Sequence, residues 1–387
     1  MLPEYFEFTL PTKLIYGIGI LGKLESALKP FGKRKAILVT DPILMKAGPV
    51  DKVREGFQDS NISIVCVYDK VPPNSTIKTV EGCARLARKN GCDMIIAVGG
   101  GSVIDTAKGV CVTLKNGGRA NDHLNMLVLT EPQTPHIAIP TTAGTGSEVT
   151  NIAVLTSKGA GRKLFIVDTR IMPNVAILDP HFTMSLPKKL IVTTAMDAMT
   201  HAIEAMTSTM ANQICDGLAL HAIRLINENL PLVVADGKNE KARLNMQLAA
   251  TMAGWAFTIA QVGLAHGMAH TIGTLHHVPH GAACGIVLPK VMRYNVDHAA
   301  DKLAQVAQAL GVNTASMKER DAALAAADAV EALMKKVGHP MRLRDVGVPE
   351  ENLAICAFHA IADTAVLFNG RPVSDPNEVL QIYTQAY

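Results

Sequence analysis

The sequence is poor in charged and aromatic residues and has no closely paired cysteines. Charged residues make up 18% of the 387 positions and aromatic residues 4%, whereas hydrophobic residues make up 48%. This composition excludes a disordered or fibrous chain and is typical of a compact globular enzyme. The formal net charge is +3 and the longest basic run is Lys33-Arg34-Lys35, which is too little to indicate nucleic-acid binding. We therefore expect no nucleic-acid partner.

Signals for membrane insertion and export are also lacking. No apolar run reaches the roughly 18 residues that a membrane span needs. Glu4 and Glu7 stand where a signal peptide would carry a basic region followed by an apolar core. The seven cysteines are spread along the chain without a C-x-x-C pair, which favours reduced thiols over disulfides or a zinc ribbon. These observations predict a cytoplasmic protein with no membrane partner.

The first half of the chain alternates between strand-like and helix-like segments. Its strand-like segments are short, apolar and β-branched. This alternation predicts a sheet of βαβ units with helices on its faces. Two further apolar runs flank the turn-rich residues 157–161 and predict a hairpin. The predicted strands are 35–40, 62–68, 94–98 and 137–139, and those of the hairpin are 152–155 and 164–167.

The pattern changes near Asp179-Pro180. After Leu186-Pro187 the chain consists of long segments rich in Ala, Met and Leu with helical periodicity. Because a chain of this length can form two domains, we predict an α/β domain over residues 1–184 and an all-helical domain over residues 185–387. The predicted helices of the second domain are 188–207, 212–228, 240–260, 263–275, 298–310, 315–337, 350–365 and 376–386.

Carboxylate and imidazole side chains recur at helical spacing in this second half. Asp197 and His201 are four residues apart, His266 and His270 are also four apart, and His280 follows. Residues four apart share one face of a helix, so Asp197 and His201 can reach one ion together with one or both of His266 and His270. We expect a loop after the second helix to bring in His280. Such ligands bind divalent ions such as Fe(II), Zn(II) or Ni(II) and usually leave a position free for water or substrate, which favours a catalytic metal.

The clustering of histidines supports this interpretation. A single histidine is more often an ordinary core or surface residue than a ligand, but five of the 13 histidines fall in one short segment. Two of the five, His276 and His277, are interpreted as surface residues or residues at the edge of a cleft, with a second metal-binding role as the alternative. The five are His266, His270, His276, His277 and His280.

A glycine-rich turn lies between a predicted strand and a predicted helix in the first half. Residues 94–98 run into Gly99-Gly100-Gly101-Ser102, and such a turn lets backbone N–H groups approach a pyrophosphate. The turn departs from the usual dinucleotide fingerprint, because the third glycine of G-x-G-x-x-G would fall on Ile104. An ordinary strand-to-helix turn explains it equally well.

Two further segments lie at the carboxyl ends of predicted strands, where open α/β sheets bind ligands. Residues 141–147 offer hydroxyl groups and flexible backbone. Asp41 ends the first predicted strand and can accept hydrogen bonds from both ribose hydroxyls of an adenosine, while repelling a 2′-phosphate. This predicts NAD rather than NADP as cofactor. The alternative for Asp41 is a turn residue before Pro42.

Taken in order, these motifs resemble the iron-containing, group III alcohol dehydrogenases. Within that family the chain looks most like lactaldehyde reductases and propanediol dehydrogenases, and the resemblance covers essentially its whole length. The motifs are Asp41, Gly99-Gly-Gly-Ser102 with Asp105, Pro140-Thr-Thr-Ala-Gly-Thr-Gly-Ser-Glu148, Met196-Asp-Ala-Met-Thr-His-Ala-Ile-Glu204, Gly263-Leu-Ala-His-Gly-Met-Ala-His270 and Pro279-His-Gly281.

The resemblance implies an N-terminal dinucleotide-binding α/β domain and an all-helical C-terminal domain, with a metal site and a cleft between them. It also implies a homodimer or larger homo-oligomer, NAD, and a divalent metal that is Fe(II) first and Zn(II) or Ni(II) as alternatives. It places His266 on the metal and His270 beside the nicotinamide and substrate, a choice that spacing left open. The implied ligands are Asp197, His201, His266 and His280, and the residues implied to join Asp41 at the cofactor are Asn74, Gly100, Gly101, Ser102, Thr141, Thr142, Thr145 and Lys163.

The reaction implied is NAD-linked interconversion of a small primary alcohol or diol and its aldehyde. His270 is the candidate for relaying the alcohol proton, because a near-neutral imidazole can both take and give one. Glu204 follows Asp197 by seven residues and so shares its helix face, as a partner for a ligand imidazole or as a plain surface charge.

Three alternatives compete with this prediction. A polyol dehydrogenase such as a glycerol dehydrogenase would use the same chemistry. A dehydroquinate-synthase-like lyase would need a cluster of Lys and Arg around its phosphorylated acidic substrate, but none occurs between Leu190 and Leu220 or between Arg243 and Pro289. A binding protein without activity would be expected to have lost ligands or cofactor motifs, and all of them are present.

Overall fold

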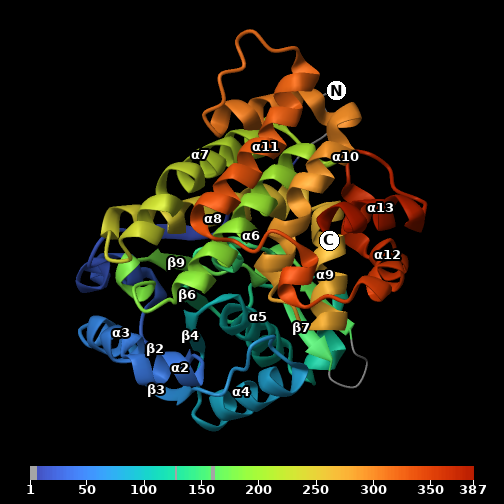
Figure 1. The fold of residues 1–387 in the computed structure, drawn as a ribbon. Coiled ribbons are helices and arrows are strands. Elements are labelled where there is room, and N and C mark those ends of the chain that lie inside the picture. Colours follow the sequence, from blue (N-terminus) through green and yellow to red (C-terminus); the bar gives the residue numbers. More distant parts are fainter. Residues whose placement is uncertain (1–6, 127–128, 158–161) are drawn as a thin grey trace. The chain divides into compact units, whose positions relative to one another are not determined.

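The computed structural model describes residues 7–126, 129–157 and 162–387, which form two compact units (Figure 1). The sheet unit comprises residues 9–142 and 146–186. The helical unit comprises residues 187–387 together with residues 7–8 and the short segment Ala143–Thr145. The chain therefore changes unit between Leu186 and Pro187, and it also contributes three residues of the glycine-rich 141–147 segment to the helical unit.

A parallel sheet of six strands forms the centre of the sheet unit in the described part of the chain. Strand β2 lies between β3 and β4, and the order continues through β6 and β9 to β1. The prediction of βαβ units is therefore confirmed. In sheet order the strands are β1 (Lys13–Tyr16), β9 (Val175–Leu178), β6 (His136–Pro140), β4 (Met94–Gly99), β2 (Arg34–Val39) and β3 (Ile62–Tyr68).

Both faces of this sheet are buried, which explains why its strands are apolar without interruption. Alternate residues point to opposite faces: Ile37 and Ile95 belong to the core cluster that includes residues of α4 (Ile77–Lys89) and α5 (Gly101–Asn116). Leu38 and Ile96 belong to the cluster on the other face, which includes residues of α1 (Glu25–Leu28) and α3 (Pro49–Phe57). With both faces covered, the turns at the carboxyl ends of the strands are where a sheet of this kind binds ligands.

A smaller sheet of three strands completes this unit. β7 (Ile152–Ser157) and β8 (Arg162–Val167) pair in antiparallel fashion, as the predicted hairpin requires, and the short β5 (Asn125–Met126) pairs with β8. The turn predicted for this hairpin includes residues 158–161, which lie outside the described residues.

The helical unit is built around α6, which packs against α7, α8 and α10. Helix α9 packs against α10, α12 and the 3-10 segment η9 (Thr364–Phe368). The helices are α6 (Lys188–Thr207), α7 (Gln213–Ala235), α8 (Glu240–Ala260), α9 (Leu264–His276), α10 (His280–Ala309), α11 (Glu319–Val337), α12 (Leu353–Ala360) and α13 (Pro376–Ala386).

One predicted element was wrong in a way that matters for function. The sequence placed His280 on a loop and began the next helix at His298, but α10 runs continuously from His280 to Ala309, with non-helical dihedral angles only at Ala299. Pro289, inside this helix, and the apolar residues around it masked the helical pattern. His280 is therefore the first residue of a helix, with Pro279 as its N-cap.

Among the described residues, α7 is by length and apolar composition able to cross a membrane, and α8 and α9 pass the same test only if they are taken together as one bent span. Helix α7 packs against α6 and α8 and buries nine residues that include Cys215, Ile223 and Leu230. A core helix of a folded domain has the same composition.

Candidate active site

Two helices of the helical unit approach each other closely where the predicted ligands lie. At Gly281 a Cβ atom would stand 2.1 Å from the Thr193 carbonyl oxygen and 3.2 Å from Asp197 Cβ. No side chain fits there, so the glycine after His280 lets the start of α10 lie directly on α6. As a result His280 Nε2 is 3.3 Å from Asp197 Oδ1.

Four side chains bring one ligand atom each to within 4.8 Å of one another. Asp197 comes from α6, His266 from α9, and His280 and Cys284 from the first turns of α10. Cys284 was missed by sequence reasoning, because a helix starting at His280 is needed to place residue 284 on the same face. Its sulfur lies 3.6 Å from His280 Nε2.

His201, the remaining predicted ligand, lies beside this group and is not one of the four. Its ring stacks on the His266 ring with centroids 4.5 Å apart and on Phe257 at 4.2 Å. Burial and the neighbouring His266 lower the pKa of His201 well below its ordinary value, while a backbone hydrogen bond with Gly144 acts in the opposite sense. The imidazole is therefore neutral, which is the form that binds metals. Its role as a ligand stays a prediction.

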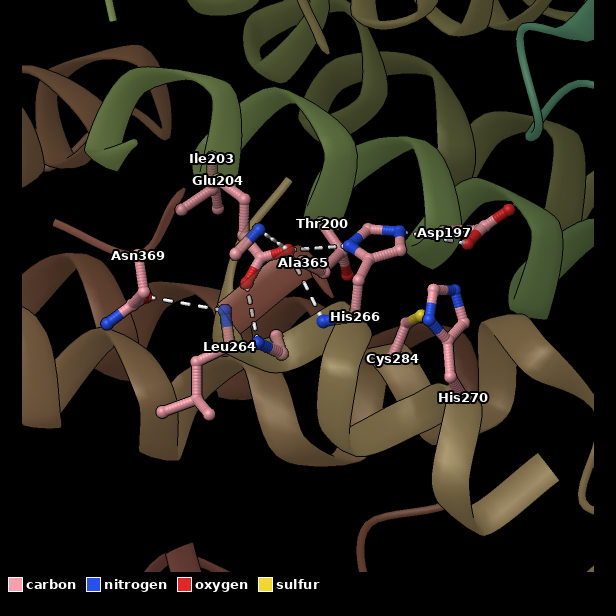
Figure 2. Close-up of polar contacts among 12 residues, drawn as sticks. Asp197, Thr200, Ile203, Glu204, Leu264, His266, His270, Cys284, Ala365 and Asn369 are labelled. Carbon is pink, nitrogen blue, oxygen red and sulfur yellow. Dashed lines mark hydrogen bonds and ion pairs between the residues drawn. The ribbon is translucent and has the colours of Figure 1, made fainter. Parts of the chain in front are cut away.

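Glu204 holds His266 in one orientation (Figure 2). One carboxylate oxygen of Glu204 accepts from the Gly263 N–H at 2.9 Å and lies 2.5 Å from His266 Nδ1, and the other accepts from the Ala265 N–H at 2.5 Å. A carboxylate at a helix N-terminus is stabilised by these N–H groups. The surface alternative for Glu204 was wrong, since only 2% of the residue is exposed.

This orientation fits the site for a divalent cation. With Nδ1–H bound to Glu204, Nε2 of His266 carries the lone pair, and it lies 3.9 Å from Asp197 Oδ1. Within the described residues, His266 Nε2 and His201 Nδ1 are buried nitrogens with no hydrogen-bond partner. Buried polar atoms of this kind call for an unseen water or ion, and a carboxylate with imidazoles and a thiol suits a borderline metal.

His270 lies one turn after His266 on α9 and binds a different carboxylate. Its Nδ1 is 2.9 Å from Asp363 Oδ2, and its ring stacks on the His280 ring at 5.3 Å. Asp363 was missed, because nothing in the sequence near residue 363 indicates a partner 93 positions away. The structure thus separates the two histidines of α9 by their neighbours: His266 faces Asp197, and His270 is held by Asp363.

Five of the predicted cofactor residues meet at the carboxyl ends of β4 and β6 in the sheet unit. The Asn74 N–H donates to Ser102 Oγ at 3.1 Å, and the Thr141 N–H donates to the Gly99 carbonyl at 3.1 Å. A Cβ atom at Gly100 would lie 3.2 Å from Thr142 Cγ2, so this glycine permits a close approach. The residues brought together are Asn74, Gly100, Ser102, Thr141 and Thr142; Gly101 follows as the first residue of α5.

The other three predicted cofactor residues are placed differently. Asp41 follows β2 and caps α2 (Pro42–Ala47), because its Oδ1 accepts from the N–H groups of Ile43 and Leu44 at 2.8 and 2.9 Å. Lys163 lies on β8 opposite Thr156. Thr145 belongs to the segment that groups with the helical unit. Their roles at a cofactor stay predictions.

Lys108 is at the centre of a buried ionic network in the sheet unit. Lys108 of α5 donates to Ser147 Oγ, Thr150 Oγ1 and the Ile152 carbonyl at 3.1, 2.8 and 2.7 Å. Burial lowers the pKa of Lys108 to about 8. Ser147 in turn donates to Asp105 at 2.6 Å, and burial raises the pKa of Asp105 although Lys108 and Lys163 act against it. The network ties the start of α5 to the segment that follows residue 146.

Comparison with known proteins gives the same assignment as the geometry. The profile of iron-containing alcohol dehydrogenases matches residues 11–180, and that of the C-terminal part of the Fe-containing alcohol dehydrogenase family matches residues 191–387. The 1,3-propanediol dehydrogenase of Citrobacter freundii is 39% identical over 99% of both chains, and the NAD-dependent methanol dehydrogenase of Bacillus methanolicus is 34% identical over 98% of this chain and 99% of its own. A crystal structure of 1,3-propanediol oxidoreductase superposes with a TM-score of 0.95 at 37% identity, covering 99% of this chain and 100% of that one. The chain belongs to the iron-containing alcohol dehydrogenase family.

Proposed function

We propose that this protein is a metal-dependent, NAD-linked alcohol dehydrogenase that interconverts a small primary alcohol or diol and its aldehyde. The observation that carries the proposal is the group of ligand atoms from Asp197, His266, His280 and Cys284, within 4.8 Å of one another. Substrates of this size agree with the names of the relatives, which act on propanediol and methanol.

Asp197, His266 and His280 would hold the metal, with His201 and Cys284 as neighbours able to complete the set. A bound divalent metal acts as a Lewis acid that lowers the pKa of an alcohol and polarises the carbonyl of an aldehyde. The contribution of this chain is to orient the ligands: Glu204 holds the His266 ring through Nδ1, and burial lowers the pKa of His201. Such supporting contacts commonly change metal affinity 10- to 100-fold.

The residues at the carboxyl ends of β2, β4 and β6 would hold NAD, which would supply the hydride acceptor for alcohol oxidation. The α5 N-terminus and the Gly99–Ser102 turn present backbone N–H groups suited to a pyrophosphate. Asn74, Thr141 and Thr142 surround this turn. Asp41, with its negative charge at the end of β2, would accept from the adenosine ribose.

His270 would carry the proton that leaves the alcohol hydroxyl. It is half-buried and lies 5.3 Å, ring centroid to ring centroid, from His280. A neutral imidazole whose Nδ1–H is bound to a carboxylate has its lone pair on Nε2, where it can accept a proton. Cytoplasmic location, homo-oligomeric assembly and preference for one alcohol remain predictions.

The test is to remove and restore the metal. Metal-stripped protein is mixed with NAD and one of ethanol, 1,2-propanediol, 1,3-propanediol, butanol or glycerol, and Fe(II) under anaerobic conditions, Zn(II) or no metal is added. We expect reduced nicotinamide to form only after metal addition and fastest with a small alcohol or diol. Silence with every alcohol and metal, and with the corresponding aldehydes plus NADH, would contradict the proposal and favour the lyase or the binding protein.

A further inference from the structure

The contact between His270 and Asp363 lies outside the metal group and has its own architecture. Asp363 precedes η9 and is its N-cap: Oδ1 accepts from the Ala365 N–H at 2.9 Å, which leaves Oδ2 for His270 Nδ1 at 2.9 Å. The Asp363 carbonyl accepts from the Val366 N–H at 3.1 Å. The backbone of the cap and the direction of its carboxylate are therefore fixed together.

Helix α9 comes unusually close to this cap. At Gly267, one turn before His270, a Cβ atom would stand 2.7 Å from Val366 Cγ2 and 3.5 Å from Asp363 Cβ. A side chain at position 267 would push η9 away. The glycine of the His266-Gly267 pair thus lets Asp363 reach the imidazole on the next turn.

The His270 ring is constrained on its other sides by histidines. The plane of the His270 ring lies 15° from that of the His280 ring and 67° from that of the His266 ring. Figure 2 shows His266 and His270. Stacking sets the plane of the ring, and the Asp363 carboxylate decides which nitrogen carries the proton. Since a carboxylate can only accept, Nδ1 carries a proton, and in the neutral imidazole the lone pair is then on Nε2.

We propose that Asp363 is a positioning residue for the dehydrogenase reaction, which fixes His270 as the Nδ1–H tautomer with its Nε2 lone pair ready for the alcohol proton. The inference rests on the proposed function for its catalytic consequence, but the tautomer itself does not depend on that function. The contact between Asp363 and His270 resembles the contact between Glu204 and His266, but it is less buried. The exposed fractions of the side chains are 18% and 20% for His270 and Asp363, and 3% and 2% for His266 and Glu204.

Asp363→Asn is the informative variant, because asparagine is as good an N-cap as aspartate and so preserves η9. Its side-chain amide, however, can rotate to offer a donor to Nδ1 and stabilise the other tautomer. We expect kcat to fall roughly 10- to 100-fold, in the range of general acid–base and supporting contacts, with KM for the alcohol and metal content unchanged. Asp363→Glu, which keeps the carboxylate, should recover part of kcat. Asp375→Asn is the matched control, since Asp375 caps α13 through the Asn377 N–H at 2.9 Å and should leave kcat unchanged.

A second readout is independent of turnover. The protein is labelled with nitrogen-15 histidine and loaded with diamagnetic Zn(II), and the His270 signals are assigned as those that vanish in His270→Gln. We expect the Nδ1–H tautomer in the wild-type protein and loss of that preference in Asp363→Asn. An unchanged tautomer, a kcat within twofold of wild type, or loss of metal from Asp363→Asn would each overturn the positioning role. If the wild-type protein oxidises no alcohol, the proposed function fails, and the tautomer spectra still decide the role of Asp363.

Discussion

The candidate sites of the sheet unit and the helical unit offer different kinds of groups to a ligand. In the sheet unit the candidate site consists mainly of backbone: the Gly99–Ser102 turn, the N-terminus of α5 and Asn74, whose φ of 58° places it in the left-handed region. In the helical unit it consists of side chains, with Asp197, Glu204 and His266 all almost fully buried. A backbone N–H group remains when the side chain of its residue is replaced, whereas a side-chain ligand is lost when its residue is replaced. We therefore expect single side-chain substitutions at the site to lower ligand binding and activity far more in the helical unit than in the sheet unit.

The strongest form of this comparison is the loss of a ligand. His266→Ala removes a buried imidazole that faces Asp197 and that Glu204 holds. We expect metal affinity and alcohol oxidation to fall together by more than about 100-fold, beyond the effect of losing a residue that only supports a ligand. Elemental analysis of the purified variant and an NADH assay measure the two quantities, and His201→Ala should behave in the same way if His201 completes the set.

The matched control is His277→Asn. His277 belongs to the same histidine-rich segment but is exposed, and its φ of 56° is one that asparagine tolerates. This variant should retain metal and activity. Full activity and metal in His266→Ala would remove the metal site from the proposal and end the contrast between the units.

A buried charged residue of the sheet unit should change stability in a way that depends on pH. Lys108 is fully buried, and its pKa is lowered by burial from 10.5 to about 8. Between these values the unfolded chain keeps the proton while the folded protein releases it, so the free energy of unfolding rises with pH. Relative to Lys108→Met, the wild type should gain roughly 2 kcal/mol between pH 7 and pH 9.5.

Denaturant unfolding of both proteins at several pH values measures this difference. The diagnostic result is that the free energy of unfolding of the wild type, relative to Lys108→Met, decreases as the pH is lowered. At low pH the Lys108 ammonium is charged in both the folded and the unfolded state, so the full cost of burying the charge is present. A difference that does not change with pH, or that shrinks as pH rises, would show that Lys108 is not held with a lowered pKa.

The two units also differed in how far the sequence predicted them. Helices α6, α8 and α13 begin and end at the predicted residues, because their apolar periodicity is uninterrupted. Strands β1 and β9 were missed: each has four residues, too few to show a pattern, and they are recognised only through the pairing that places them together at one edge of the sheet.

The site was predicted where ligands follow helical spacing and missed where they depend on packing. Asp197, His266 and Glu204 lie on two helices whose faces could be read from the sequence. Cys284 required knowing that α10 starts at His280, and Asp363 is brought to His270 by the close packing at Gly267. Contacts between distant segments of this kind leave no local signal in a single sequence.

The smallest expected effect concerns Asp41, where the sheet unit does use a side chain. Asp41 caps α2 through Oδ1, and the proposal adds a contact to the adenosine ribose. Asp41→Ser separates the two roles, because serine caps a helix as well as aspartate but carries no charge. We expect the melting temperature to stay the same and the preference for NAD over NADP in kcat/KM to fall about tenfold, as the loss of one charge-assisted hydrogen bond implies. Asp51→Ser, at an exposed position of α3, should change neither quantity. If the Asp41→Ser protein keeps its preference for NAD, Asp41 acts only as a helix cap. The cofactor site of the sheet unit would then consist of backbone and hydroxyl groups alone, in contrast to the charged side chains and imidazoles of the helical unit.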